Sequence, residues 1–560
     1  MKLLRLKLLS PFRSLHKGFE LQFRNKNFSV EDVLEPICMV GLNGSGKSNT
    51  LEVICEIFYY LELNTFTDGQ NLEAINERYS SLGFEVDYRI SPLKWKTTIN
   101  SSPEVLPFDE HTEVIIRCSK QINEEIQIFA VDAIRQDETP YPLQHELWKE
   151  VLPNKVIGYT SGQNELISNP FIRLDFHYFD EFVKSTSEKN IATNTDVNRM
   201  FFMDYDSNEL VVLANYLFQD HELMAWKDRE AFNEKLGIKQ LHSFSIKIQF
   251  KNYDNKYIPF PSELNLGIER LKRCATTWID SETELDEKNK KNRIIELSFF
   301  SDGAVRKAFR NVFKTPYELF RLLYLMRLMN IHCISPKIRN IIKNAPKGTN
   351  LSDLIPKVTV DDLVFKIDCI KFIKNNATQP IRYKQLSDGE HQLLHVIGTL
   401  RLMQERDVLF ILDEPETHFN PEWRAKMIRL IMSNGDKETF QDHFITSHSP
   451  FIISDCKPTN VYLFHRDHNR INVQTAHDKR LNTFGTSVNI LTEEVFNKNE
   501  SQGDYSLNVL NEIKNRTFTN LEEIQQAKED ARVLGESVEK TLLFRKLLMI
   551  EDELKSKEKK

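Results

Sequence analysis

The chain has 560 residues, of which 40% are hydrophobic and 28% are charged, and its formal net charge at pH 7 is -7. A chain of this length exceeds one ordinary hydrophobic core, so we expect two or three folded regions. The acidic balance excludes a protein that binds nucleic acid through its overall charge, so any such contact needs a local basic patch.

The sequence predicts a soluble, cytoplasmic protein. No apolar run reaches the length of a membrane span, and charged residues within Met1–Lys7 occupy the place where a signal peptide is apolar. The seven cysteines form no close pairs, so neither a zinc site nor a disulfide framework is expected. A reducing compartment without membrane contact fits this pattern.

A strand, a glycine-rich loop and a helix are predicted in succession near the N-terminus, after a predicted hairpin between Leu3 and Phe23. Pro36–Val40 predicts a buried strand, and apolar residues at helical spacing from Leu51 onward predict the helix. Between them, Gly41–Ser48 reads GLNGSGKS, which fits the pattern of a phosphate-binding loop.

The chemistry of this loop is nucleotide binding. Its glycines let backbone N–H groups face phosphates, Lys47 supplies a positive charge, and Ser48 offers a hydroxyl to Mg²⁺. The pattern occurs in many nucleotide enzymes, so by itself it predicts a bound nucleotide and Mg²⁺ without fixing the class of enzyme. The loop residues predicted to bind the nucleotide are Asn43, Gly44, Ser45, Gly46, Lys47, Ser48 and Asn49.

The middle of the chain mixes strands, loops and helices. Strands are predicted at Gly83–Tyr88 and Glu113–Arg117, and a strand-like run begins at Val156. Polar runs at Ser185–Asn198 and Asp280–Arg293 are predicted to be mobile loops that bound an inserted region.

One helix within this inserted region has a clear start signal. Thr315 and Glu318 form a capping-box pair around a proline at the first helical position. The following Leu319–Met329 is apolar on nearly every face, so this helix is either deeply buried or covered by a partner.

A basic stretch follows and is predicted to be a loop. Its cations either contact a nucleic-acid backbone or are simply solvated, and without interleaved aromatic residues the sequence leaves both interpretations open. These cations are Lys337, Arg339, Lys343 and Lys347.

Two carboxylates follow a predicted central strand in the C-terminal half. Val408–Leu412 is a short continuous apolar run, typical of a parallel strand, after strands predicted near residues 363 to 372. Asp413 and Glu414 come next, at the end where open parallel sheets place their ligands. His448 follows another apolar run. The simpler alternatives are an acidic surface turn and a structural histidine.

A hairpin and a helical region are predicted after His448. Val461–Phe464 and Ile471–Gln474 predict two strands, so the histidines between them fit a turn better than a metal-nuclease site. A charged helical region opens at Thr519–Glu522 and continues to the lysine-rich end.

Together, Gly41–Ser48 and the segment Leu386–Glu390, which reads LSDGE, resemble the Walker A and signature motifs of ABC-type ATPases. The resemblance implies that Ser387 and Gly389 reach the γ-phosphate of ATP held by another subunit. One copy of each motif therefore implies a homodimer that sandwiches ATP between its heads, or a higher oligomer. Asp388 and Glu390 depart from the common pattern, which puts the fine geometry in doubt but leaves the serine and the glycine intact.

The same resemblance implies roles for five further residues. Asp413 would hold Mg²⁺, Glu414 would act as the general base, and His448 would contact the γ-phosphate. Gln163 is the candidate for the lobe-joining glutamine that senses the metal, although a plain polar turn is as good an interpretation. Arg13, in Phe-Arg-Ser, resembles an arginine of RecF-like heads that approaches nucleotide, although an exposed hairpin arginine explains it equally well.

Less specific features of the sequence suggest a further resemblance, to ATPases of prokaryotic defence systems. The long interval between Ser48 and Leu386, the Phe12–Ser14 opening and the DEPETH sequence from Asp413 resemble RecF-like and SMC-like ATPases. The nearest resemblance is to restriction-system-associated ATPases of the Septu PtuA type, some of whose relatives accompany retrons. This resemblance implies an HNH nuclease (PtuB-like) as partner, and a retron reverse transcriptase with its DNA or RNA as a further one.

We therefore expect an α/β fold, namely an ABC-type P-loop ATPase head with a mixed sheet. Lobe I would span residues 1–175, a mainly helical insertion 176–360, lobe II 361–475 and a helical extension 476–560. The leading hypothesis is a dimeric ATPase that senses or regulates a partner nuclease and is not itself a nuclease. The alternatives are a RecF/SMC-like ATPase that acts directly on DNA in repair or at DNA ends, and an ATP-binding scaffold with negligible turnover.

Overall fold

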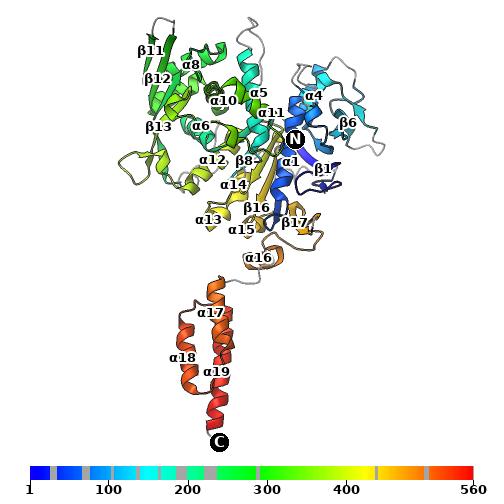
Figure 1. The fold of residues 1–560 in the computed structure, drawn as a ribbon, viewed down its shortest axis with the longest axis vertical. Coiled ribbons are helices and arrows are strands. Elements are labelled where there is room, and N and C mark those ends of the chain that lie inside the picture. The colour runs from blue at the N-terminus through cyan, green and yellow to red at the C-terminus, as the bar shows by residue number, and fades with distance from the viewer. Residues whose placement is uncertain are drawn as a thin grey trace. The chain divides into compact units, whose positions relative to one another are not determined.

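The computed structural model describes residues 1–25, 35–65, 76–102, 106–133, 139–161, 166–184, 199–219, 236–285, 290–434, 439–468, 470–496 and 503–558. The chain divides into two compact units, Met1–Thr486 and Ser487–Lys560. The first unit is a mixed α/β structure with three sheets, and the second is helical (Figure 1). None of the helices in the described ranges has the length and apolar character needed to cross a membrane.

A seven-stranded sheet in the order β18-β17-β3-β16-β15-β8-β9 forms the centre of the first unit. Each neighbouring pair is parallel except β17 and β18, which form an antiparallel hairpin. The strands are β3 (Ile37–Gly41), β8 (Lys155–Thr160), β9 (Met200–Met203), β15 (Val408–Asp413), β16 (Asp442–Ser447), β17 (Val461–Asp467) and β18 (Arg470–Thr475).

The register of this sheet brings distant parts of the sequence to one edge. Asp413 at the end of β15 pairs with Thr160 on one side and with Thr446 on the other. Ser447, the last residue of β16, pairs with Val40 of β3. Because these strands are parallel, the segments that follow them leave the sheet at the same edge. The predicted strands around Pro36–Val40 and Val408–Leu412 are confirmed as β3 and β15.

A second, antiparallel sheet contains the N-terminal hairpin in the order β2-β1-β4-β5-β6-β7. Its strands are β1 (Lys2–Leu8), β2 (Glu20–Gln22), β4 (Phe84–Arg89), β5 (Val114–Lys120), β6 (Gln127–Asp132) and β7 (Tyr141–Pro142). Helix α1 (Lys47–Leu63), which follows β3, has nearly all of its side chains buried. The predicted hairpin and the predicted α1 helix are thus confirmed.

A third, antiparallel sheet in the order β11-β12-β10-β13-β14 corrects one prediction. Its strands are β10 (Ile238–Gln249), β11 (Thr277–Leu285), β12 (Lys290–Phe300), β13 (Phe365–Lys374) and β14 (Ile381–Arg382). The predicted loop Asp280–Arg293 is wrong, because its two ends lie in β11 and β12. Asp280 accepts a hydrogen bond from Arg293 at 2.8 Å and pairs with Lys272 at 2.9 Å, and the bond from Arg293 lowers the pKa of Asp280 to about 2. Polar side chains paired across exposed strands account for the loop-like composition.

Helices cover these sheets, and helix α10 decides between the two interpretations of the apolar segment Leu319–Met329. The chief helices are α5 (Asn169–Lys184), α6 (Tyr205–Leu217), α8 (Ser262–Cys274), α9 (Gly303–Val312), α10 (Pro316–Leu328), α11 (Pro336–Asn344), α12 (Asp388–Leu402), α13 (Pro421–Arg424), α14 (Met427–Asn434) and α15 (Pro450–Ser454). Thr315 caps α10 as the sequence predicts, by accepting a hydrogen bond from the Glu318 backbone at 3.1 Å. The apolar residues of α10 are buried against α6 and other elements of the same chain. The apolar character of α10 therefore reflects burial and requires no partner.

The basic stretch after α10 is helix α11 and not the predicted loop. Arg339 lies over the ring of Phe179, and Lys343 pairs with Asp180. Lys347, beyond the end of α11, lies over the ring of Tyr79, so three of the four cations are engaged within the chain, which weakens the stretch as a nucleic-acid surface.

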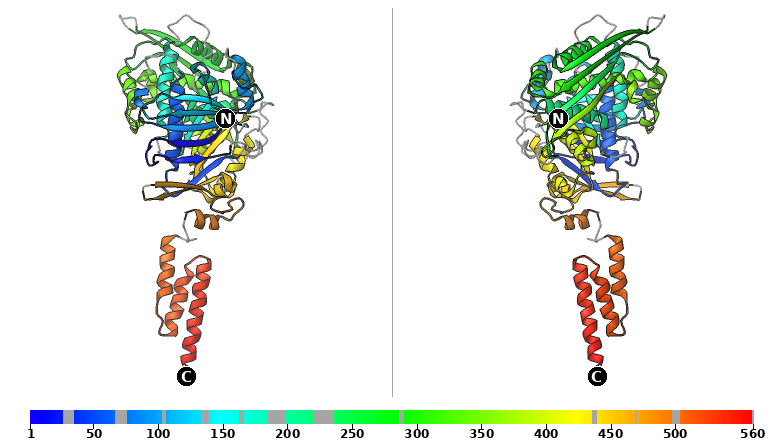
Figure 2. Two further views of the ribbon diagram at one scale, coloured as in Figure 1. Left: turned by 90° about the vertical axis from the view of Figure 1, so that its right-hand side faces the viewer. Right: turned by 90° about the vertical axis from the view of Figure 1, so that its left-hand side faces the viewer.

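The second unit contains α16 (Val488–Phe496), α17 (Asp504–Asn515), α18 (Leu521–Arg532) and α19 (Val538–Glu558). The last three helices run side by side in both views of Figure 2. Their common core consists of Leu510, Ile513, Ile524, Ala527, Ala531, Leu534, Leu543 and Leu547. The predicted charged helices after Thr519 are confirmed as α18 and α19.

A candidate nucleotide site at the edge of the parallel sheet

The glycine-rich loop joins β3 to α1 and is packed tightly at its end. Gly46 has a φ of 99°, and a Cβ atom there would lie 2.3 Å from the Cδ1 atom of Ile471 on β18. Backbone conformation and close packing thus both favour glycine. The Thr50 backbone donates to the Gly46 carbonyl at 3.0 Å, which starts the helix at this point.

Lys47 is folded back onto its own loop. Its Nζ atom donates to the carbonyl oxygens of Gly41 at 3.0 Å and Leu42 at 3.2 Å. Burial lowers the pKa of Lys47 to about 8, and Glu414 and Asp413 oppose this shift. The ammonium group is therefore close to the two carboxylates and remains positively charged at pH 7.

Hydroxyl groups from three segments of the chain donate hydrogen bonds to the carboxylate of Asp413. Its Oδ1 atom accepts from Ser48 at 3.0 Å and from Thr446 at 2.6 Å, and its Oδ2 atom accepts from Thr160 at 3.5 Å. Magnesium prefers hard oxygen ligands and keeps several waters, so a carboxylate beside a serine hydroxyl fits this ion. Ser48 and Asp413 are the residues that would hold it.

Glu414 lies next to this cluster in an uncommon backbone conformation. Its φ is 49°, and its backbone N–H donates to the Thr446 hydroxyl at 3.0 Å. Its Oε1 atom lies 3.1 Å from Nε2 of His448. The hydrogen bond with His448 lowers the pKa of Glu414, so this carboxyl group is ionised at neutral pH. An ionised carboxylate oriented by an imidazole is suited to accept a proton from water.

Thr446 is the functional candidate that sequence reasoning missed. It is fully buried, and its single hydroxyl donates to Asp413 and accepts from the backbone of Glu414. The sequence feature that could have identified Thr446 is its position two residues before His448, at the end of an apolar run. Only the register of β16 against β15 places it beside both carboxylate residues.

The signature segment starts helix α12. Ser387 is exposed and caps this helix, with its hydroxyl 3.0 Å from Oε2 of Glu390. Glu390, one of the two departures from the common pattern, therefore completes a capping box and also accepts from Lys374 at 2.8 Å. Among the described residues, the hydrogen bonds of Ser387 and those of Lys47 go to different partners.

Gly389 links the signature to the segment that follows the two carboxylates. A Cβ atom at Gly389 would lie 2.9 Å from the carbonyl oxygen of His418. The His418 backbone also donates to the Gln392 side chain at 2.9 Å. The start of α12 therefore packs directly on the loop after β15.

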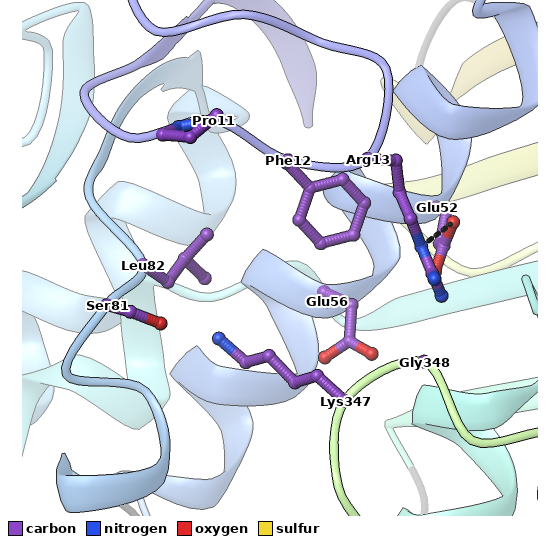
Figure 3. A pocket seen from close by; sticks show the side chains of 9 residues that line it. All are labelled: Pro11, Phe12, Arg13, Glu52, Glu56, Ser81, Leu82, Lys347 and Gly348. Atoms are coloured by element: carbon purple, nitrogen blue, oxygen red, sulfur yellow. Dashed lines mark hydrogen bonds and ion pairs between the residues drawn. The ribbon is translucent and has the colours of Figure 1, made fainter.

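The remaining predicted residues lie around the first turn of α1 or outside the described ranges. Asn49 donates to the Ser14 hydroxyl at 2.6 Å, and Arg13 pairs with Glu52 at 2.8 Å (Figure 3). Asn43 and Gly44 are exposed, whereas Ser45 is buried. Gln163 lies outside the described residues, although β8 before it ends beside Asp413.

A family model matches part of the chain. Residues 196–454 match the family described as an AAA domain, putative AbiEii toxin, Type IV TA system. The match covers less than half of the chain. It includes the signature, Asp413, Glu414 and His448, whereas Lys47 lies before it. A comparison with curated proteins returned no match. The matched segment indicates an AAA-type ATPase domain, and with it ATP binding and hydrolysis.

Proposed function

We propose that the protein is an ABC-type ATPase that hydrolyses ATP and works as a homodimer. The observation that carries this proposal is the convergence of Ser48, Asp413, Glu414 and His448 at one edge of the parallel sheet. They come from segments up to 400 positions apart, so the fold must place them together. Ion pairs that only stabilise a fold do not require a glycine-rich loop and a helix N-terminus beside them.

Each residue of the site has a separate role in ATP hydrolysis. The loop from Asn43 to Asn49 and the Lys47 ammonium bind the phosphates, and Ser48 and Asp413 orient the metal. When bound, Mg²⁺ neutralises charge on the phosphate oxygens. Glu414 accepts a proton from the attacking water, and His448 holds the carboxylate in position.

The Glu414→Gln substitution tests this assignment. It keeps the size of the side chain and removes its basicity, so turnover should fall by about 100-fold or more while ATP affinity is retained. Glu422→Gln is the matched control, because Glu422 is an exposed glutamate on α13 that pairs with Lys426. Equal turnover in the two variants would remove Glu414 from the mechanism.

We further propose that the ATPase regulates a partner nuclease in antiphage defence. Support comes from the resemblance to PtuA-type ATPases and from the matched family, whose description names a toxin of a toxin–antitoxin system. ATP-driven pairing of two heads would change the pose of the helical regions and so hold or release an HNH nuclease (PtuB-like).

Copurification from the native operon tests the partner. A tagged chain should retain the nuclease in one nucleotide state more than in the other. A chain that copurifies with no neighbouring gene product, with or without ATP, contradicts this role. Strong salt-sensitive DNA binding by the isolated protein would instead favour direct action on DNA.

A further inference from the structure

Helix α19 carries apolar side chains on two opposite faces. Its inner face joins the core that it shares with α17 and α18, through Leu543, Leu547, Ile550 and Leu554. These residues recur at spacings of four, three and four positions, so they lie on one side of the helix. Packing within the second unit therefore accounts for the inner face.

The outer face of α19 consists of Val538, Leu542, Arg545, Met549, Asp552 and Ser556. Its residues recur at alternating spacings of four and three positions, which is the pattern of a helix that packs along a second helix. Val538, Leu542 and Met549 are nevertheless 72%, 58% and 62% exposed. Leu548, next to this face, is 50% exposed. A stripe of exposed apolar side chains on a helix that already has a buried face indicates an interaction surface.

The outer face begins at an open pocket of about 620 Å³. Tyr505 and Val533, which line this pocket together with Val538, are 85% and 90% exposed. Glu536 and Glu539 add carboxylates to its lining. At roughly 30 Å³ for each water molecule, the pocket has room for several side chains. It therefore fits a helix end that carries both apolar and basic residues.

Charged residues alternate in sign along α19 and the turn before it. The acidic segment Glu536–Glu539 is followed by basic Arg545–Lys546, by acidic Glu551–Glu553 and by the lysine-rich sequence Lys555–Lys560. Ion pairs within the unit, such as that of Lys555 with Glu551 at 2.7 Å, involve some of these residues. Arg545 and Asp552 belong to the exposed outer face.

The order of these charges favours one orientation for two copies of α19. In a parallel pair each charged segment would face itself, and like charges repel. In an antiparallel pair that crosses at Met549, residues equally far from Met549 face each other. Arg545 then lies opposite Glu553 and next to Asp552 of the second copy, and the lysine-rich sequence lies opposite Glu536–Glu539. The outer face is therefore complementary to itself when the two helices run in opposite directions.

We propose that the outer face of α19 is an interface that binds the outer face of α19 in a second copy of the chain, in antiparallel orientation. Met549 and Leu548 form its apolar centre, and Arg545 pairs with the acidic segment of the other copy on both sides of this centre. The interface uses no residue of the nucleotide site and needs no ATP. It thus goes beyond the proposed pairing of the heads, because it keeps two copies together when no nucleotide is bound.

Analytical ultracentrifugation of the full-length protein without nucleotide tests this interface. The natural sequence should sediment as a dimer. Met549→Asp should raise the dissociation constant by about 100-fold or more, because it places two carboxylates at the apolar centre. Val360→Asp is the matched control, since Val360 is 64% exposed in the first unit, and it should change nothing. Equal dissociation constants for Met549→Asp and the natural sequence overturn the proposal.

Charge reversal tests the orientation. Arg545→Glu should weaken the dimer by about tenfold, and Arg545→Glu/Asp552→Arg should restore it. The two residues are seven positions apart, or roughly 10 Å along the helix, so a restored affinity reports contact between copies and not within one. In a parallel pair each residue faces its own counterpart, so the double variant would restore nothing, and that result overturns the antiparallel interface.

The Lys47→Ala variant separates this interface from the proposed ATP-dependent pairing of the heads. It should remain a dimer without nucleotide, whatever its ATPase rate. A natural sequence that is monomeric without nucleotide and dimerises when ATP is added overturns the α19 interface and leaves the pairing of the heads intact. A natural sequence that is monomeric in both conditions assigns the outer face to the first unit of the same chain or to a different protein, and overturns the proposal as well.

Discussion

At the residue scale, the buried hydroxyl of Thr446 connects the carboxylate of Asp413 to the backbone N–H of Glu414. Thr446→Val keeps the shape and leaves Asp413 and the Glu414 backbone without this partner, so we expect turnover to fall by about 10- to 100-fold. Thr446→Ser should restore most of the activity, because it restores the hydroxyl. Steady-state kinetics as a function of Mg²⁺ check this. A valine variant with unchanged kcat and unchanged Mg²⁺ dependence would contradict the positioning role.

A functional residue can be predicted from the sequence when the residues next to it in the chain form a recognisable motif. The sequence alone singles out Lys47, Ser48, Asp413 and Glu414 as candidates, because a glycine-rich loop and an apolar strand flank them directly. It does not single out Thr446, because the position of Thr446 beside Asp413 depends on the pairing of β16 with β15, which no neighbouring residue reveals.

At the element scale, the start of α12 is set by its contact with the loop after β15. Alanine favours helices over glycine by about 1 kcal/mol, yet a Cβ atom at Gly389 would meet the His418 carbonyl at 2.9 Å. We therefore expect Gly389→Ala to lower both the melting temperature and the ATPase rate. Gly303→Ala, in the first turn of α9 with open space around it, should not lower either. Identical melting curves for the two variants would show that this contact has no effect.

Strands and helices could be predicted from the sequence where most of their side chains are apolar and buried. They could not be predicted where polar side chains are held by partners distant in the sequence. β3 and β15 carry continuous apolar residues and α10 is apolar on nearly every face, so these elements can be identified without tertiary information. The β11–β12 hairpin was mistaken for a loop, because its ends carry polar side chains paired across exposed strands. Helix α11 was mistaken for a loop because its basic residues are engaged by side chains distant in sequence, such as Asp180.

At the scale of the whole molecule, buried histidines should make the protein sensitive to acid. Burial lowers the pKa of His395 to about 4 and that of His443 to about 3. Below pH 6.5 the unfolded chain binds protons that these folded histidines do not, so stability present above pH 6.5 is lost as the pH falls toward 4. At pH 5 each histidine should cost on the order of 2 kcal/mol.

Urea unfolding at pH 7 and pH 5 measures this loss. His443→Gln should lose less stability than the natural sequence between the two pH values. The control His468→Gln, whose side chain is 98% exposed, should leave the loss unchanged. An equal loss in all three proteins would exclude His443 as a source of acid sensitivity.

The proposed homodimer rests on the resemblance of Leu386–Glu390 to a signature motif, which places Ser387 of one copy at the ATP held by Lys47 of another. The most direct measurement is a structure of the Glu414→Gln variant with ATP and Mg²⁺, determined by cryo-electron microscopy. We predict a dimer in which each triphosphate touches Lys47 of one chain and Ser387 of the other. An ATP-filled assembly in which Ser387 lies remote from every nucleotide would contradict the account.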